Sequence, residues 1–401
     1  MLDFDTAQDR LIQAAVRPTR SERIPVAQAL GRVVATNILA TIAIPPADNS
    51  AMDGYAIRLA DFESGKGLPI QQRCYAGDVP EALKTGHAIR LFTGSLMPAG
   101  ADTVIMQENC AEENDVVFIQ STPTLHDHVR VKGEVMSEGK TIILKGKPLN
   151  SGHIAMLASQ GVTEVDVYPM PKIGILTTGD ELAQPGQPLK EGQIYNSNAP
   201  MLSAMVQQLN AHVHLSLHAK DTLEDIQQAL TTLCQECDLV LTVGGVSVGD
   251  KDLVKPAIEA LGGEMNLWKV RMKPGKPVAL AHIGDTPVVG LPGNPVSSFA
   301  VFSLMVSPMI RVLQGRRHAM PRVFYGTLEC NQTFKGSREE FIRVQARADA
   351  NGSVALTPHE QQGSAIISSL AWATGLARIP ANTEVKNGDV VAYYDLRHWA
   401  H

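Results

Sequence analysis

Residues 169–318 alternate apolar, strand-like runs with helical segments, and this alternation constrains the fold more than any other feature of the sequence. Lys172–Thr178 is an almost unbroken apolar run, and the helical spacing of Asn196–Asn210 follows it. Strands that lack a polar face are buried on both sides, as in a parallel sheet covered by helices. The pattern therefore predicts an open, mostly parallel α/β sheet. The further elements predicted in this region are the strands His212–His218, Asp238–Val243, Asn266–Met272, Pro277–His282 and Pro287–Leu291 and the helices Thr222–Glu236, Asp252–Leu261 and Pro295–Leu313.

A β-rich segment precedes the sheet region. Residues 41–138 contain short β-like runs separated by clusters of glycine, proline and asparagine, a pattern typical of strands joined by tight turns. Helical spacing is present on both sides of this segment, in Asp5–Val16 and Pro25–Ala40 before it and in Asn150–Ala158 after it. The segment is therefore predicted to be an inserted domain whose two ends lie close together.

These patterns predict a multidomain α/β and β protein. A small helical or mixed base domain is assigned to residues 1–40 and 139–168, and the inserted β-rich domain to residues 41–138. The α/β sheet domain takes residues 169–318. β-like runs return in residues 319–401, where they predict a C-terminal β-barrel, with a small sandwich as the alternative.

Charge and composition argue against nucleic acids and membranes as partners. The 401 residues are 44% hydrophobic and 19% charged, which is typical of a globular chain. Lysine and arginine number 35 against 41 acidic residues, for a formal charge of −6 without blocks of like charge. Binding to nucleic acid or to an anionic membrane is therefore disfavoured. The most apolar stretch, Val296–Ile310, is too short for a membrane span and contains Pro308.

The cysteines and the N-terminal sequence both favour a reduced, cytoplasmic location. Five cysteines spread over the chain do not form a disulfide framework. The segment MLDFDTAQDR carries acidic residues and lacks the basic and then apolar pattern of a secretion signal.

Three predicted strands of the sheet end in glycine-rich loops. These loops are Thr177–Glu181, Gly244–Asp250 and Gly290–Pro295. Ligands of open parallel sheets bind beyond the carboxyl ends of the strands. Glycine lets backbone N–H groups approach a ligand, and each loop is expected to lead towards a helix N-terminus, where an anion is favoured. The loops together predict a site for phosphate or another oxyanion.

Charged side chains beside these glycines suit a divalent cation and an anion. Carboxylates are the ligands that Mg²⁺ takes alongside substrate phosphates, and lysine supplies compact positive charge. The candidates are Asp180, Glu181, Asp250 and Asp252 as acids and Lys269, Lys273 and Lys276 as cations. The alternative is that Asp252 only caps a helix and that the lysines form a solvated face.

Other motifs point to weaker alternatives. Gly245–Gly249 matches the G-x-S-x-G elbow of serine hydrolases around Ser247, but Gly249, Asp250 and Lys251 intervene before the helix that Asp252 is expected to cap, whereas an elbow needs its helix to begin right after the serine. Neither a Walker-type phosphate loop nor a dinucleotide-binding fingerprint is present. Cys234-x-x-Cys237 lies late in a predicted helix and is interpreted as packing. The pairs His212-x-His214 and His126-x-His128 fall in strand-like or loop segments without a third ligand and are interpreted as ordinary surface or core residues.

Six motifs together resemble the molybdopterin molybdenumtransferase family of molybdenum insertases, and the chain is also similar to the E domain of gephyrin. The resemblance extends over essentially the whole chain. The motifs are DNSAMDGYAIR at 48–58, FTGSLMPAGADTVIMQE at 92–108, TTGDEL at 177–182, GGVSVGDKD at 244–252, KPGKPVALA at 273–281 and GLPGNPVSS at 290–298.

The resemblance implies an activity and an assembly. Adenylyl-molybdopterin and molybdate would be the substrates, molybdenum cofactor and AMP the products, and Mg²⁺ the assisting ion. The chain would form an elongated homodimer of four domains per subunit, with the β-rich insert of one subunit reaching the sheet cleft of the other. A molybdopterin-adenylylating protein is the implied upstream partner.

The resemblance also assigns roles to residues. Asp53 and Thr93 would be contributed in trans to a site that contains Glu181, Asp221 and Asp252, the three implied ligands of Mg²⁺. Lys273 and Lys276 match catalytic positions near the oxyanion, and Arg343 and Ser364 match residues that help present molybdate. The remaining implied ligand-binding residues are Thr178, Gly179, Asp180, Gly244, Gly245, Ser247, Gly249, Pro292, Gly293, Asn294, Pro295 and Ser297.

One position departs from the family pattern. An aspartate usually follows Gly-Glu in the motif that reads Gly133-Glu134-Val135 in this chain. Glu134 could substitute for it, the position could be dispensable, or the chain could be a paralogue that uses tungstate. A non-catalytic, pterin-binding dimeric scaffold is the alternative from a different class.

Overall fold

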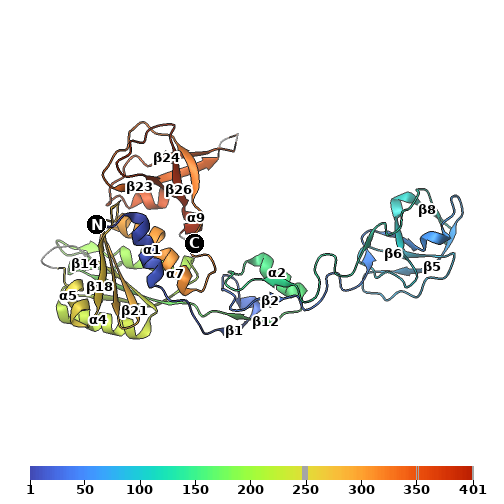
Figure 1. The fold of residues 1–401 in the computed structure, drawn as a ribbon, viewed down its shortest axis with the longest axis horizontal. Helices are drawn as coiled ribbons and strands as arrows, with labels where there is room; N and C mark the ends of the chain where they lie inside the picture. The colour runs from blue at the N-terminus through green and yellow to red at the C-terminus, as the bar shows by residue number, and fades with distance from the viewer. Residues whose placement is uncertain (246–251, 349, 351, 400–401) are drawn as a thin grey trace. The chain divides into compact units, whose positions relative to one another are not determined.

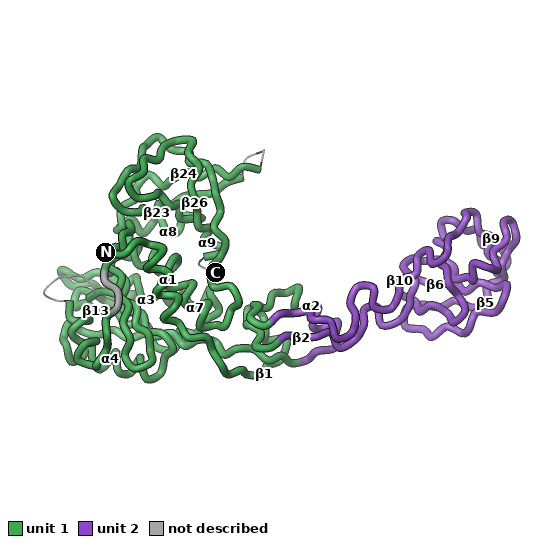
Figure 2. The backbone as a smooth tube through the Cα atoms, viewed as in Figure 1, with its two compact units in different colours: residues 1–36, 145–154, 164–401 green, residues 37–144, 155–163 purple. Residues whose placement is uncertain are grey.

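The computed structural model describes residues 1–245, 252–348, 350 and 352–399 (Figure 1). The chain forms two compact units (Figure 2). Unit 1 comprises residues 1–36, 145–154 and 164–401, and unit 2 comprises residues 37–144 and 155–163. The four-domain division made from the sequence stays a prediction.

Unit 1 contains the predicted open sheet. Its six strands lie in the order β16-β13-β17-β21-β20-β18. The first four run parallel to one another, β20 pairs antiparallel with β21, and β18 pairs antiparallel with β20. Only β20 therefore runs against the other five strands of this sheet, and the prediction of a mostly parallel sheet is confirmed. The strands are β16 (His212–Ala219), β13 (Lys172–Thr178), β17 (Leu239–Val243), β21 (Thr286–Leu291), β20 (Pro277–Ile283) and β18 (Glu264–Lys269).

Helices bury both faces of this sheet. Successive side chains of a strand point to opposite faces, and in β13 Ile173 and Ile175 enter one core cluster while Leu176 enters the other. Gly174 faces the Leu176 side, where an added Cβ would lie 2.9 Å from Leu233. The first face is covered by α3 (Asn198–Gln208) and the second by α4 (Leu223–Glu236) and α5 (Val254–Ala260).

The longest apolar helical run is continuous from Pro295 to Leu313, as predicted. It consists of α6 (Pro295–Val301), a π-helical turn at Phe302–Val306 and α7 (Ser307–Leu313). Among the described residues it is the one helix long and apolar enough to cross a membrane, and 94% of that window is buried inside the protein. Such burial is typical of a core helix.

The N-terminal helix α1 (Phe4–Ala14) packs into the same core. Asp3 caps it by accepting a hydrogen bond from the Thr6 N–H. Phe4 and Leu11 are fully buried in the cluster that contains the first face of the sheet.

The helix predicted at Pro25–Ala40 is wrong. This segment contains the end of β1 (Glu22–Pro25), a 3₁₀ turn at Val26–Gln28 and β2 (Ile38–Leu39). The buried Val33 and Val34 of this segment pair in an extended chain, Val33 with Pro148 and Val34 with Val167 of β12 (Glu164–Val167), rather than forming one helical face. The helix predicted after the insert is confirmed as α2 (Ser151–Ser159).

Unit 2 contains the β-rich insert. Its main sheet has the strand order β7-β4-β6-β5-β9-β8. The two chain segments that enter and leave the insert pair as β2 and β11 (Thr141–Ile143), which confirms that its ends are adjacent. The remaining strands are β3 (Asn49–Ser50), β4 (Gly54–Ile57), β5 (Leu68–Cys74), β6 (Ala88–Leu91), β7 (Thr103–Met106), β8 (Cys110–Glu113), β9 (Val116–Ile119) and β10 (Val129–Arg130).

The C-terminal part of unit 1 is the predicted β-barrel. Its strands follow the order β23-β24-β22-β26-β25, and β25 pairs back to β23 and closes the barrel. The elements are β22 (Phe324–Leu328), β23 (Glu339–Ala348), β24 (Val354–Pro358), α8 (Ser368–Trp372), β25 (Gly375–Ile379), β26 (Val390–Asp395) and α9 (Leu396–Trp399).

The strand predicted at Asn266–Met272 is wrong at its end. β18 stops at Lys269, and Met272–Lys273 forms a separate strand, β19. β19 pairs with the start of β23, with Met272 opposite Glu339. The sheet domain and the barrel are therefore joined by backbone hydrogen bonding next to the predicted lysines.

We expect Arg378→Met to destabilise the contact between α1 and the barrel. The Arg378 guanidinium donates to both oxygens of Asp5, at 2.9 and 2.6 Å, and to Glu339 at 2.8 Å. Its loss leaves Glu339, whose side chain is 17% exposed, without its cation. The free energy of unfolding should fall by about 2 kcal/mol, the cost of a partly buried polar group left without its hydrogen-bond partner, measured by urea denaturation. Arg23→Met is the matched control, because Arg23 binds Asp166 but is 64% exposed and should cost less than about 1 kcal/mol. Equal losses in the two variants would contradict the expectation.

Candidate active site

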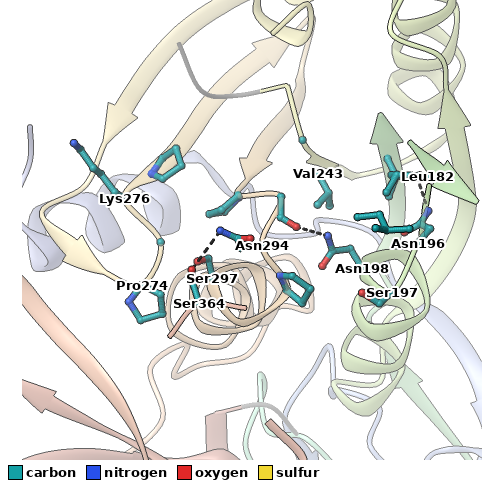
Figure 3. A pocket seen from close by; sticks show the side chains of 18 of the residues that line it. Leu182, Asn196, Ser197, Asn198, Val243, Pro274, Lys276, Asn294, Ser297 and Ser364 are labelled. Carbon is teal, nitrogen blue, oxygen red and sulfur yellow. Dashed lines mark hydrogen bonds between the residues drawn. The ribbon is translucent and has the colours of Figure 1, made fainter. Parts of the chain in front are cut away.

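A cleft of about 900 Å³ lies at the carboxyl edge of the parallel sheet in unit 1 (Figure 3). The ends of β13, β17 and β21 meet there with the starts of α3 and α6 and with part of the barrel. The lining residues are Thr177, Thr178, Glu181, Leu182, Ile194, Tyr195, Asn196, Ser197, Asn198, Val243, Gly244, Lys273, Pro274, Gly275, Lys276, Pro277, Pro292, Gly293, Asn294, Pro295, Ser297, Arg338, Gln362, Gly363 and Ser364.

The loop after β13 contributes Thr178 and Glu181 to the cleft. An added Cβ on Gly179, which has φ +141°, would lie 2.6 Å from the Glu181 carboxylate. The expectation that this loop leads to a helix is wrong, because it leads into the short parallel pair β14 (Leu182–Ala183) and β15 (Ile194–Tyr195) before α3 begins.

Two acidic residues meet at the neighbouring strand ends of β13 and β16. The backbone N–H of Asp180 donates to the Asp221 carboxylate at 3.3 Å, and the N–H of Asp221 donates to the Asp180 carboxylate at 3.4 Å. The two loops therefore hold each other, with both carboxyl groups beside the edge of the sheet.

The loop after β17 is described only at its two ends. Gly244 lines the cleft, and an added Cβ would lie 3.0 Å from the Thr178 carbonyl oxygen. Ser247, Gly249 and Asp250 lie outside the described residues. The prediction that Asp252 caps the next helix is wrong, because α5 begins at Val254 and its N-cap residue is Leu253.

The loop after β21 leads directly into α6, as predicted. Asn294 is the N-cap residue and Pro295 is the first residue of the helix. The Asn294 amide donates to the Ser364 hydroxyl at 3.3 Å, and this bond links the sheet to the barrel. The Ser298 hydroxyl donates to the Pro292 carbonyl and holds the turn.

Cations reach the cleft from two directions. Lys273 and Lys276 lie on the segment before β20, and Lys273 forms an ion pair with Glu340 at 2.8 Å. Arg338 also lines the cleft and donates to the Met272 carbonyl at 3.3 Å. Lys269, the third predicted lysine, is not among the described lining residues.

Arg343 is buried within the barrel, and only 1% of it is exposed. Its guanidinium donates to the Ser369 hydroxyl and to the carbonyls of Gln361, Gln362 and Gly363 at 3.0 to 3.1 Å. These bonds hold the loop that carries Ser364 to the cleft. Direct contact of Arg343 with molybdate stays a prediction.

Asp53 and Thr93 form a local pair in unit 2. The backbone N–H and the hydroxyl of Thr93 donate to Asp53 Oδ1 at 2.7 and 2.8 Å. These hydrogen bonds, the backbone one first, hold the pKa of Asp53 below its ordinary value. The residue after Asp53 has to be glycine, because a Cβ added to Gly54 would lie 2.0 Å from the Ile105 carbonyl oxygen of β7.

The departure from the family motif lies at the surface of unit 2. Val135 is 65% exposed. The Glu134 carboxylate accepts a hydrogen bond from the Val131 N–H at 3.0 Å, so it is engaged in its own turn.

Comparisons with known proteins match every part of this architecture. Three family models cover the chain: "MoeA N-terminal region (domain I and II)" at residues 2–161, "Probable molybdopterin binding domain" at 174–312 and "MoeA C-terminal region (domain IV)" at 325–396. The molybdopterin molybdenumtransferase of Haemophilus influenzae is 34% identical over 372 residues, which are 92% of each chain. The enzyme of the same name from a Nostoc species is 37% identical over 80% of this chain and 76% of its own.

The chain belongs to the molybdopterin molybdenumtransferase family. The crystal structure of the molybdopterin biosynthesis MoeA protein from Pyrococcus horikoshii OT3 agrees, with a TM-score of 0.84, 28% identity and coverage of 98% of this chain and 99% of that one.

The structure brings many of the residues predicted from the molybdenumtransferase motifs to one cleft. Those that line it are Thr178, Glu181, Gly244, Lys273, Lys276, Pro292, Gly293, Asn294, Pro295, Ser297 and Ser364. Of the other predicted residues, Gly179, Asp180, Asp221, Gly245, Asp252 and Arg343 are described but are not in the lining, and Asp53 and Thr93 lie in unit 2.

Sequence reasoning missed several polar residues of the cleft. Arg338 directly precedes β23, whose first residues pair with β19. Asn196 precedes α3, and Asn198 begins it. The only sequence signal for the two asparagines was the polar run Asn196-Ser197-Asn198 in front of a helix. Nothing in the sequence distinguished Arg338 from the other arginines of the chain.

The pKa values of Cys234 and Cys237 support the interpretation of both residues as packing residues. Burial raises the pKa of Cys234 to about 12 and that of Cys237 to about 11. Both side chains are therefore neutral thiols near pH 7, and α4 uses them as apolar residues.

We expect Thr93→Val to raise the pKa of Asp53. The substitution removes the hydroxyl donor and keeps the backbone donor, so the pKa should move part of the way back to its ordinary value. A ¹³C NMR titration of the aspartate carboxyl groups measures this shift. Thr124→Val is the matched control, because Thr124 donates in the same way to Asp127 and should leave Asp53 unchanged. An Asp53 pKa unaffected by Thr93→Val would contradict the assignment.

Proposed function

We propose that the chain is a molybdenum insertase that converts adenylyl-molybdopterin and molybdate to molybdenum cofactor with release of AMP. The observation that carries the proposal is the cleft, where the ends of three parallel strands meet Lys273, Lys276 and Arg338. Both substrates are anionic, and a site lined by cations and open backbone suits them. The relatives named molybdopterin molybdenumtransferase support the same reaction.

The proposed anion site combines helix and side-chain charge. The helical run that begins at Pro295 continues to Leu313, and the Asn294 side chain makes no capping bond within the described chain. The first N–H groups of this run are therefore available to a phosphate or molybdate oxygen. Lys276 and Arg338, which also line the cleft, would add positive charge to this anion site.

We propose that Mg²⁺ binds at the acidic side of the cleft, where carboxylates of the protein and phosphate oxygens of the substrate would both coordinate it. No group of three metal-ligating side chains exists among the residues described. Mg²⁺ nevertheless binds through one or two carboxylates plus substrate phosphates. Glu181 lines the cleft, and Asp221 meets the Asp180 loop at the same edge of the sheet. As the family resemblance implies, Glu181, Asp221 and Asp252 would hold the ion. When bound, the ion would polarise the phosphoanhydride.

The complete site is proposed to need two subunits. Asp53 and Thr93 belong to unit 2, whereas the cleft belongs to unit 1. In the proposed homodimer, the insert of one subunit supplies these two residues to the cleft of the other. The two hydrogen bonds from Thr93 would keep Asp53 ionised and oriented. A cytoplasmic location and delivery of adenylyl-molybdopterin by the adenylylating protein complete the proposal.

Purified protein is expected to release AMP from adenylyl-molybdopterin when Mg²⁺ and molybdate are present. Chromatographic quantification of AMP, with reconstitution of a molybdenum enzyme as the second readout, measures the reaction. Lys276→Ala should lower the rate at least tenfold, because the oxyanion loses a charge-assisted contact. Lys255→Ala, on the outer helix α5, is the control and should leave the rate unchanged.

Two outcomes of this experiment would change the proposal. Release of AMP with tungstate but not with molybdate would identify the tungstate-using paralogue. Binding of molybdopterin by a folded dimer without any AMP release would favour the non-catalytic scaffold.

Mixed dimers test the shared site. Asp53→Ala and Asp252→Ala homodimers should both be inactive. Mixing them should restore about a quarter of the wild-type activity, because in a random mixture half of the dimers are heterodimers and each of these has one intact site. AMP release after subunit exchange is the measurement, and failure to recover any activity while heterodimers form would exclude the shared site.

A further inference from the structure

Asn198 lies in the wall of the cleft, and only one of the two polar atoms of its side-chain amide has a hydrogen-bond partner among the residues described. It is the first residue of α3 and is 9% exposed. Its Nδ2 donates to the Gly293 carbonyl at 2.7 Å (Figure 3). Its Oδ1 is buried and has no hydrogen-bond partner among the residues described.

The neighbouring Asn196 shows what a structural asparagine does in the same wall. Its Nδ2 donates to the Thr177 hydroxyl at 3.0 Å, and its Oδ1 accepts from the Ala199 N–H at 3.2 Å. Both ends of Asn196 are therefore occupied by protein.

The bond to Gly293 fixes the orientation of the Asn198 amide. Because Nδ2 is held by a carbonyl, the opposite atom must be the acceptor Oδ1. Buried side-chain acceptors nearly always have a partner. An oriented acceptor in a cleft wall, without a protein donor, is what a ligand donor requires.

The surroundings of Asn198 identify the part of the ligand. Leu182 and Val243 lie on its side of the cleft, whereas Lys276 and Pro274 lie on the other side (Figure 3). The cleft thus has one side with apolar residues, where Glu181 adjoins Leu182, and an opposite, cationic side. A ligand with an anionic group and a flat heterocycle would bind with the ring on the Asn198 side.

We propose that Asn198 Oδ1 accepts a hydrogen bond from an exocyclic amino group on the heterocycle of the substrate. This inference rests on the proposed function, and it assigns Asn198 as a specificity-determining residue of that same cleft. Adenylyl-molybdopterin carries two rings with such an amino group, the pterin and the adenine. A neutral carboxamide oxygen would accept from either ring without adding charge.

Paired ligands that differ only in the amino group test the proposal. The adenine pair is AMP and purine riboside 5′-monophosphate. The pterin pair is pterin-6-carboxylate and its analogue with hydrogen in place of the 2-amino group. Dissociation constants are measured by calorimetry or pterin fluorescence with the full-length wild-type chain and with Asn198→Leu.

In one of the pairs, the wild-type chain should bind the amino ligand about tenfold more tightly than its analogue, the effect of one hydrogen bond. Asn198→Leu should abolish that preference by weakening the amino ligand and not its analogue. The pair in which this occurs identifies the ring that contacts Asn198.

The controls separate recognition from folding. Gln207→Leu makes the same chemical change on an exposed position of α3 and should keep the preference. Equal thermal midpoints of the two variants would show that Asn198→Leu is folded, and Asn198→Ser replaces it if it is not.

The inference is overturned if the wild-type chain shows no preference in either pair, or if Asn198→Leu keeps the wild-type preference. These readouts are binding constants and do not depend on turnover. Loss of AMP release with the preference intact would overturn the proposed function and not the role of Asn198.

Discussion

The alignment of three parallel strand ends is the constraint on which the cleft depends. Thr177 of β13 lies opposite Val243 of β17, and Val243 lies opposite Leu291 of β21. The three strands therefore end at the same level, and their loops have to meet. β20 runs in the opposite direction, with Ala279 opposite Gly290, so its start lies at the same edge. This reversal is what brings the segment with Lys273 and Lys276 to the cleft.

The sheet and the glycine loops could be predicted because their signals are local. β17 is buried along its whole length and its sequence is correspondingly apolar, so no other assignment of the segment was reasonable. The helix wrongly predicted at Pro25–Ala40 shows the reverse case, in which the structure depends on residues distant in the sequence. Apolar residues there are spaced as in a helix, but Gly31 has φ +76°, and the buried Val33 and Val34 pair with Pro148 and Val167, which lie more than 100 residues later in the sequence. A local pattern cannot report such a partner.

The polar residues that the sequence did not reveal are those placed by contacts between distant segments. Arg338 reaches the cleft because β19 pairs with the start of β23, with Met272 opposite Glu339. Asn198 faces the cleft because its amide binds Gly293 in the loop after another strand. Arg343 matched a family motif, yet its guanidinium holds the backbone of the Ser364 loop. Residue type alone could not separate a side chain that contacts the ligand from one that shapes the loop.

The distribution of charge in the cleft also explains why a chain with a formal charge of −6 suits anionic substrates. Local potential, rather than net charge, decides where an anion binds. Glu340 offsets part of the charge of Lys273, which leaves Lys276 and Arg338 to dominate one wall. The opposite side, around Asn198 and Leu182, contributes Glu181 and no cation to the lining, so a second anion bound there would lose its hydration without a counter-charge. In the proposed binding mode, the phosphate of the substrate therefore lies towards the lysines and its ring towards Asn198.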